Sequence, residues 1–432
     1  MVKRAEIFSK ALLKNLKNII ENDNTKESYR TSEVCFTRNR NLSFSNLVYF
    51  LLQLGKSSIQ QELDLYFDEH FYTKSALSQH RLKLKPELFV DLNKSQCDFY
   101  YTKASHIKKW KGYRLVGIDG STMQLPFSDN LVENYGHFET RTENNRKVVL
   151  ARISQAYDVL NQISIDAQID HYRTSELSFA HRHLAHINTR DLLLMDRGYS
   201  AFWFMSLLTK KSCNFLIRLK AKRFNVGKTF LASNKKEQLI RLTPSNEAVK
   251  KCKEVGASVK PLDLRLIRVP IKGGEDQVLI TNLTDKQEYK HIELCKLYKK
   301  RWPVEESFKH LKLRAELENL SGKSHIVVQQ DFHRIIMRAN LATILSNQMS
   351  QKGVKIINKI RKKTYQINRT QAYRKIKKVI NTTSHNFNKI NNQLQLYAIA
   401  LIKQVERYRP NRSNPRIKRY AGKPANFMCY KP

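Results

Sequence analysis

The order of strand-like and helix-like segments between residues 113 and 211 constrains the fold of this chain most strongly. Residues 114–125 (RLVGIDGSTMQL) predict a strand that carries Asp119. Residues 148–159 and 162–170 predict two more strands, joined as a hairpin at Leu160 and Asn161. A helix over 175–187, an apolar strand over 191–195 that ends at Asp196, and a helix over 200–211 follow. The predicted order is therefore β-β-β-α-β-α.

This is the order of an RNase H-like α/β core, in which the first and fourth strands are neighbours. Because the first of those strands carries Asp119 and the fourth ends in Asp196, the two aspartates are expected to face each other. The next 109 residues, up to Glu305, exceed what such a core needs. They contain strand-like stretches (FLIRLKAKRF, LRLIRVPIK, QVLITNL) with a Gly273-Gly274 turn, so we expect an inserted β subdomain.

The flanks of this core have helical character. We predict five regions: a helical, DNA-end-binding region over 1–105, core over 106–205, inserted β subdomain over 206–290, core over 291–330, and a basic helical C-terminal region over 331–432. Within the first region, apolar and basic helices over 44–84 are compatible with a helix-turn-helix or with an ordinary helical bundle. The tail after residue 407 is basic, with prolines, and is expected to be extended.

A second feature is the spacing Tyr298-x2-Arg301-x3-Glu305-x6-Lys312. On a helix these offsets fall on one face, which would carry a phenol, a carboxylate and two cations. A carboxylate flanked by Arg and Lys suits chemistry on phosphates, because it can hold a metal while the cations hold the phosphate. The alternative is a solvated helix stabilised by i,i+4 ion pairs such as Arg301 with Glu305. Glu306 would point about 100° away from Glu305.

The charge balance favours a nucleic-acid partner. The chain has 78 Lys and Arg against 38 Asp and Glu, a net charge of +40 over 432 residues. An excess this large is typical of proteins that bind a polyanion. No apolar run approaches the ~20 residues of a membrane span, and the N-terminus does not have the pattern of a secretory signal. The six cysteines are scattered, which fits free thiols in a reducing compartment and not a zinc finger.

With Glu305, the two aspartates form a set of three carboxylates. Oxygen ligands suit Mg²⁺, or Mn²⁺ as its substitute, and two such ions about 3.5–4 Å apart promote phosphoryl transfer.

These motifs resemble the DDE transposases of bacterial insertion sequences, specifically the insertion-sequence-four family with its Y-x2-R-x3-E-x6-K signature. Residues around Asp119 (VGIDGSTMQLP) resemble the family's first motif, and those around Asp196 (LLLMDRGY) its second. The resemblance implies an Asp119, Asp196 and Glu305 triad with two Mg²⁺, and cut-and-paste cleavage and strand transfer, with a hairpin intermediate in relatives. It implies DNA partners (terminal inverted repeats and target), a homodimer in the DNA complex, and a cytoplasmic, nucleoid-associated bacterial protein.

In that family the signature Tyr, Arg and Lys handle the terminal phosphate, which here implies Tyr298, Arg301 and Lys312. Trp302 is placed to stack on a DNA base, although a core tryptophan is equally compatible with the sequence.

Other candidates rank lower. His181, His183 and His186 have poor geometry for zinc, and Asp158, Asp166 and Asp170 on the hairpin are expected to face solvent. Two further functions stay open: a related metal-dependent nuclease that does not transfer strands, and an inactive descendant that only binds DNA ends. The intact acidic residues disfavour the second of these.

Overall fold

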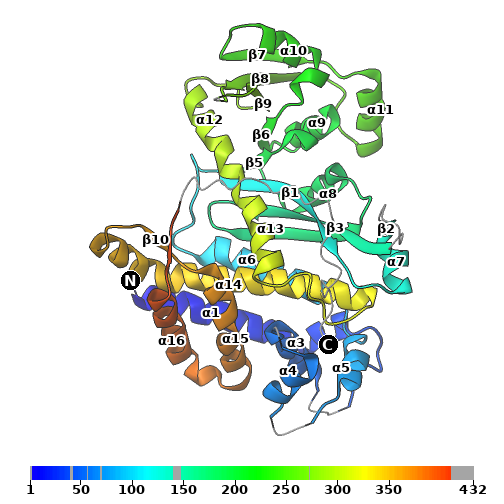
Figure 1. Cartoon of the computed structure of the whole chain (residues 1–432), viewed down its shortest axis with the longest axis vertical. Helices are drawn as coiled ribbons and strands as arrows, with labels where there is room; N and C mark the ends of the chain where they lie inside the picture. Colours follow the sequence, from blue (N-terminus) through cyan, green and yellow to red (C-terminus); the bar gives the residue numbers. More distant parts are fainter. Residues whose placement is uncertain are drawn as a thin grey trace. The chain divides into compact units, whose positions relative to one another are not determined.

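The computed structural model describes residues 2–38, 42–55, 57–68, 71–139, 147–271 and 273–409. The chain divides into two compact units (Figure 1). The first unit comprises Met1–Ser105, Met123–Ala151 and Lys309–Pro432, and the second comprises His106–Thr122 and Arg152–Phe308. The expected extended tail lies almost entirely outside the described residues. Within the described ranges, no helix has the length and apolar character needed to cross a bilayer.

The described strands form one large sheet and one small one. The large sheet has the order β2-β3-β1-β5-β6-β9-β8-β7, with β4 paired to β3, and β10 pairs with β11. The strands are β1 Arg114–Gln124, β2 His137–Glu139, β3 Lys147–Asp158, β4 Ile163–His171, β5 Asp191–Met195, β6 Asn214–Arg218, β7 Glu237–Leu242, β8 Leu262–Val269, β9 Gln277–Thr281, β10 Tyr365–Gln366 and β11 Glu406–Arg407.

The predicted pairing of the first and fourth strands is confirmed. β1 and β5 run parallel, and the register aligns Arg114 with Asp191 and Ile118 with Met195. All five residues of β5 are buried, as are four of the first five of β1, so two apolar faces fix this register. Asp119 follows Ile118 within β1, and Asp196 follows Met195 at the end of β5. The two aspartates therefore come at equivalent positions of neighbouring parallel strands.

The expected β subdomain does not form a separate sheet. β6 runs parallel to β5, and β9, β8 and β7 then extend the same sheet by antiparallel pairing. The stretch also contains two helices, α10 Asn225–Ala232 and α11 Asn246–Val255. Apolar residues on both faces of this continuous sheet form two buried clusters. The sequence pattern identified β6, β8 and β9, but it did not identify β7 or the addition of these strands to the central sheet.

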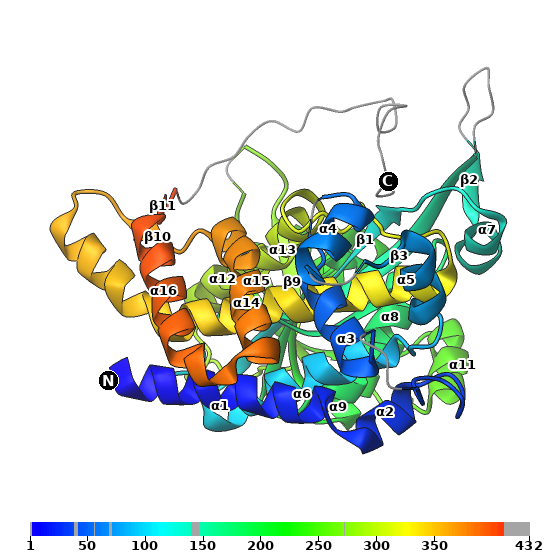
Figure 2. The ribbon, with the colours of Figure 1, turned by 90° about the horizontal axis from the view of Figure 1, so that it is seen from below.

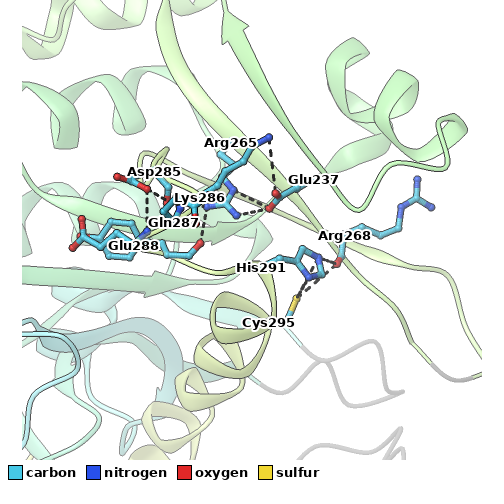
Figure 3. A network of polar contacts seen from close by, with 10 residues as sticks. Glu237, Arg265, Arg268, Asp285, Lys286, Gln287, Glu288, His291 and Cys295 are labelled. Atoms are coloured by element: carbon cyan, nitrogen blue, oxygen red, sulfur yellow. Dashed lines mark hydrogen bonds and ion pairs between the residues drawn. The ribbon is translucent and has the colours of Figure 1, made fainter.

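A polar network fixes the connection from β9 to α12 (His291–Tyr298) (Figure 3). The fully buried Arg265 on β8 forms an ion pair with Glu237 on β7. Its guanidinium also donates to the carbonyl oxygen of Tyr289 at 2.7 Å. His291 lies 3.0 Å from the carbonyl oxygen of Arg268, which ties the first turn of α12 to β8. The segment that leads to the signature residues is therefore held against the sheet.

The first unit is mainly helical (Figure 2). α14 is 36 residues long, and α1, α3, α6, α15 and α16 all pack against it. Segments from both ends of the chain thus share one bundle, as the bundle alternative for residues 44–84 predicts. The helices of the first unit are α1 Val2–Ile20, α2 Asp23–Tyr29, α3 Phe44–Gln53, α4 Ile59–Tyr66, α5 Lys74–Arg81, α6 Glu87–Lys103, α7 Asp129–Tyr135, α14 His325–Ile360, α15 Arg369–His385 and α16 Ile390–Lys403.

Three further helices belong wholly to the second unit or begin in it. α8 (Glu176–His183) and α9 (Phe202–Lys210) are the two helices predicted after the hairpin, and α13 (Pro303–Leu313) carries Glu305. The hydroxyl of Ser175 accepts from the backbone N–H of Ser178 and so caps the start of α8.

Candidate functional site

A close contact between β1 and α13 brings Glu305 to the aspartates. A Cβ atom on Gly117 would lie 3.3 Å from the Cβ of Val304 and 3.1 Å from a methyl group of Val159. A side chain at position 117 would require Val304 or Val159 to move by a few tenths of an ångström, so glycine favours this close approach of strand and helix. Val304 is fully buried, and the next residue is Glu305. The glycine of VGIDG therefore positions the first turn of α13 over the strand that carries Asp119.

The signature residues do not lie on one continuous α-helix, which corrects the sequence prediction. α12 ends at Tyr298, a 3-10 turn spans Lys299–Arg301, and α13 begins at Pro303. Proline lacks a backbone N–H and suits the first position of a helix, so a new helix starts there. The backbone at Trp302 still has right-handed helical angles, so Arg301 and Glu305 remain neighbours. Lys312 falls in the part of α13 that belongs to the first unit.

Arg301 is the common partner of the three predicted carboxylates. Its Nη2 donates to Oε1 of Glu305 at 2.7 Å, the i,i+4 pair that the structural alternative predicted. Its charge also acts on Asp119 and on Asp196. Burial by itself lowers the pKa of Arg301, but Tyr298, Glu305 and Asp196 raise it on balance. The guanidinium is thus a fixed positive charge among three carboxylates.

The side-chain carboxyl group of Asp119 has a strongly shifted pKa. Its pKa is raised to about 6, chiefly because the side chain is buried, and Glu305 and Glu176 add to the rise. Arg301 and the backbone N–H of Gly120 oppose the shift without cancelling it. Carboxylates that crowd together in this way repel one another unless a cation compensates. The site therefore has a deficit of positive charge that Arg301 alone does not fill.

Asp196 offers an oxygen without a hydrogen bond. Its side chain is 38% exposed, but the Oδ1 atom is buried and accepts no hydrogen bond. Arg218 approaches that atom only to 3.9 Å. A buried carboxylate oxygen without a donor is costly, and a ligand with a positive charge would satisfy it.

The predicted DNA-contacting residues differ in exposure. Tyr298 is mostly buried, which raises its pKa to about 12, and its ring lies 5.9 Å from the Arg301 guanidinium carbon. Trp302 is 53% exposed and also lies 5.9 Å from that carbon, so the core alternative for Trp302 is wrong. Lys312 lies 3.8 Å from Glu318 within the first unit. Glu306 is exposed.

Glu176 is a fourth carboxylate near Asp119 that the sequence analysis missed. It lies in the first turn of α8, and its Oε1 accepts from Nη2 of Arg152 at 2.5 Å. A Cβ atom on Gly120 would lie 3.3 Å from its Cγ, and one on Gly198 would lie 3.0 Å from its Oε2. Glu176 thus lies close to Gly120, the residue after Asp119, and to Gly198, two residues after Asp196. The capped start of α8 was a signal for a helix but carried no information on what its first turn would face.

A chain of buried hydrogen bonds joins β1 to β3, α8 and β4. It includes Asp166, which was expected to face solvent. The Ser154 hydroxyl donates to the carbonyl oxygen of Asp119 at 3.1 Å. His183 lies 2.9 Å from that hydroxyl, and its Nδ1 lies 2.6 Å from Oδ2 of Asp166. Asp166 is buried, and its pKa falls to about 2 because the bonds to His183 outweigh the effect of burial.

Asp158 is also fully buried, where it accepts from the backbone N–H groups of Leu160 and Asn161. The expectation of solvent-facing carboxylates was therefore wrong for Asp158 and Asp166. Asp170 is 37% exposed and pairs with Arg182 at 2.6 Å. His186 lies 3.8 Å from Asp166, and the ring of His181 lies 6.1 Å from that of Trp203.

The donor set fits a hard divalent cation. Carboxylate oxygens suit Mg²⁺ and Mn²⁺, and the unsatisfied Oδ1 of Asp196 and the crowded Asp119 both favour an added positive charge. Within the residues that the structure describes, no three His, Cys, Asp or Glu side chains are already grouped closely enough to hold an ion. The carboxylates share Arg301 as their counter-ion.

Comparisons with known proteins identify transposases that are similar to this chain. Transposase InsG for insertion sequence element IS4, from Escherichia coli (strain K12), is 23% identical over 289 residues, which cover 65% of this chain and 63% of that protein. The chain thus aligns with less than two thirds of the length of this curated relative. The cryo-EM structure of a piggyBac transposase synaptic complex with hairpin DNA aligns with a TM-score of 0.45 and 10% identity, over 92% of this chain and 85% of that one.

A family model described as a transposase DDE domain matches residues 110–341. The matched range includes Asp119, Asp196 and Glu305. It covers more than half of the sequence, so the chain belongs to the DDE transposase family, and its predicted likeness to insertion-sequence-four transposases is confirmed.

Proposed function

We propose that the chain is a metal-dependent DNA transposase that binds the terminal inverted repeats of an insertion sequence, cleaves them and joins them to target DNA. The observation that carries the proposal is that Arg301, which pairs with Glu305, also acts through its charge on Asp119 and Asp196. Such a carboxylate set beside a fixed cation suits phosphoryl transfer on a polyanion.

The strand order supports an RNase H-like catalytic core. The order β4-β3-β1-β5-β6, with β1 and β5 parallel, is the arrangement expected of that fold. We propose that Asp119, Asp196 and Glu305 hold two Mg²⁺ ions, or Mn²⁺ as a substitute. When bound, such ions activate the attacking oxygen and stabilise the leaving one.

The remaining signature residues are proposed to position the DNA. Arg301 would grip the terminal phosphate with two hydrogen bonds, while Tyr298 and Lys312 add a phenol and a mobile charge. The exposed Trp302 is available to stack on a base near the cleaved end. The hydrogen bond from Arg301 to the Glu305 carboxylate orients the guanidinium.

The helical region over 1–105 is proposed to bind the element ends, and the basic helices beyond residue 331 to contact the DNA backbone. We further propose that the protein acts as a homodimer on the paired ends, in the bacterial cytoplasm at the nucleoid. These proposals rest on the net charge of +40 and on the family relationship.

The test is a cleavage and joining assay with the full chain and duplexes that carry the inverted repeats flanking its gene. With Mg²⁺, the unchanged protein and Glu306→Ala should nick and join, whereas Asp119→Ala, Asp196→Ala and Glu305→Ala should do neither. All variants should bind the duplex, because cationic contacts supply most of the affinity. Nicking without joining would identify a nuclease, and end binding without nicking would identify an inactive descendant.

A further inference from the structure

A second concentration of positive charge lines a cavity of about 280 Å³ in the first unit. Helices α14 and α15 and the segment between α3 and α4 contribute to its wall. The wall carries two carboxylates, Glu62 and Glu316, against five cations. These cations are Arg314, Arg334, Arg338, Arg374 and Lys377.

Arg338 is the most deeply buried of these cations. It is 2% exposed, and its guanidinium donates to the carbonyl oxygens of Leu54 at 3.1 Å and Tyr373 at 2.9 Å. Its Nε atom is buried and has no hydrogen-bond partner. Among the described residues, no ion pair includes Arg338; the charge of Glu62 favours its charged form, but Glu62 already pairs with Lys377. A buried charge without an ion pair of its own is costly, which is a reason to expect an anion there.

The carboxylates that pair with the neighbouring cations are already shared or occupied. Arg334 pairs with Asp331 at 2.8 Å, but Asp331 also pairs with Arg81 at 2.9 Å. Lys377 pairs with Glu62 at 2.8 Å. Burial nevertheless lowers the pKa of Lys377, and the charges of Arg338 and Arg334 lower it further. The positive charges in this wall therefore repel one another.

The backbone makes room for this arrangement. A Cβ atom on Gly55 would lie 2.1 Å from Nζ of Lys377 and 2.4 Å from Oε1 of Glu62. Any other residue at position 55 would displace the ion pair from the wall. Arg314 and Arg374 differ from the others because they are exposed, so an incoming ligand can reach them.

We propose that this cavity binds a phosphate group, with the buried Arg334 and Arg338 and the exposed Arg314 and Arg374 as its cationic wall. Arginine forks match phosphate oxygens with paired hydrogen bonds. The volume lies just below the range of pockets that hold drug-sized molecules, so it suits a small phosphate-bearing group. The phosphate could belong to DNA or to a free phosphate compound. The cavity shares no residue with the carboxylate site, and the inference does not depend on the proposed function.

The experiment measures binding of inorganic pyrophosphate to the full chain by calorimetry at low ionic strength, without added metal. Arg338→Gln risks misfolding, so the test variant is Arg314→Ala with Arg374→Ala. Its matched control is Lys378→Ala, which removes an exposed cation on α15 that does not line the cavity. Circular dichroism checks that all variants fold.

We expect the unchanged chain and Lys378→Ala to bind pyrophosphate alike, and the double variant to bind at least about tenfold more weakly. No binding by the unchanged chain, or equal losses in the test and control variants, would overturn the proposal. A second arm adds short duplex DNA as a competitor. Displacement of pyrophosphate by the duplex identifies DNA as the source of the phosphate, whereas undisturbed binding identifies a free phosphate compound.

Discussion

Arg301 shows how one residue compensates several charges in the site. It neutralises part of the charge of the carboxylates around it, and its bond to Glu305 orients both side chains. The sequence predicted Asp119, Asp196 and Glu305 because strand order and helical spacing are local signals. It did not predict Glu176, whose position depends on how α8 packs. The burial of Asp158 was also missed, although an aspartate beside a turn commonly accepts from the next backbone N–H groups.

The first prediction concerns the geometry of Arg301. Arg301→Ala should still bind Mn²⁺ but should lose joining more than first-strand nicking, because its role is to orient a phosphate. Loss of hydrogen bonds to a charged group should slow joining by roughly ten- to a hundredfold. Arg301→Lys should recover only part of this loss, since lysine lacks the fork. A stepwise assay on pre-nicked ends measures this. An equal loss at every step together with loss of Mn²⁺ binding would show that Arg301 only holds the helix.

The second prediction concerns pH and stability. The pKa of His310 is lowered to about 3, because the ring is buried and because Arg369 and Arg314 lie near it. The unfolded chain would therefore bind a proton between pH 6.5 and 3 that the folded chain does not, so stability should fall as pH falls below 6.5. At pH 5 this costs about 2 kcal/mol. Chemical denaturation at pH 7.5 and 5 should show a smaller drop for His310→Gln than for the unchanged chain. An identical drop would contradict a neutral, buried His310.

At the scale of elements, contacts between distant segments determine which strands and helices are neighbours, and the sequence predicted only some of these pairings. The parallel pairing of β1 with β5 followed from two apolar strands in the expected order. The extension of that sheet by β6, β9, β8 and β7 did not, because strand patterns do not specify which edge a strand joins. The break between α12 and α13 was also missed. Pro303 is compatible with the first turn of a helix, and the 3-10 turn before it nearly preserves the helical spacing.

The third prediction tests the contact between β1 and α13. Gly117→Val should destabilise the protein by about 1–3 kcal/mol through overpacking and should reduce cleavage, because α13 and its Glu305 must shift. Gly117→Ala should have a smaller effect. Adding Val304→Ala to Gly117→Ala returns space and should restore part of the cleavage that Gly117→Ala loses. If the losses of cleavage in Gly117→Ala and Val304→Ala simply add up in the double variant, the close approach of β1 and α13 does not position Glu305.

At the scale of the whole molecule, each unit is assembled from segments that are distant in the sequence. The first unit combines residues from both ends of the chain around α14. The sequence predicted helices there but not their partners, since amphipathic patterns show which face is buried and not which helix covers it. The buried ion pair of Arg81 with Asp331, 250 residues apart, is an example of a contact with no local signal.

The fourth prediction concerns the net charge. Because the chain carries +40, its binding to non-specific duplex DNA should weaken steeply with salt. The logarithm of the association constant should fall linearly with the logarithm of salt concentration, by ~0.9 per phosphate neutralised. Fluorescence anisotropy over a range of about 50 to 200 mM salt measures the slope. An affinity that does not change with salt would contradict DNA-backbone binding by the basic surface.

The central claim is that Asp119, Asp196 and Glu305 form one divalent-metal site, and Mn²⁺ binding tests it most directly. Electron paramagnetic resonance of Mn²⁺ added to the full chain reports the bound fraction without requiring DNA or activity. Glu305→Ala and Asp196→Ala should each weaken Mn²⁺ binding at least about tenfold, since each removes a charged ligand. Glu306→Ala, which removes the adjacent exposed carboxylate, should bind Mn²⁺ as the unchanged chain does. Equal binding by Glu305→Ala and the unchanged chain would contradict the account.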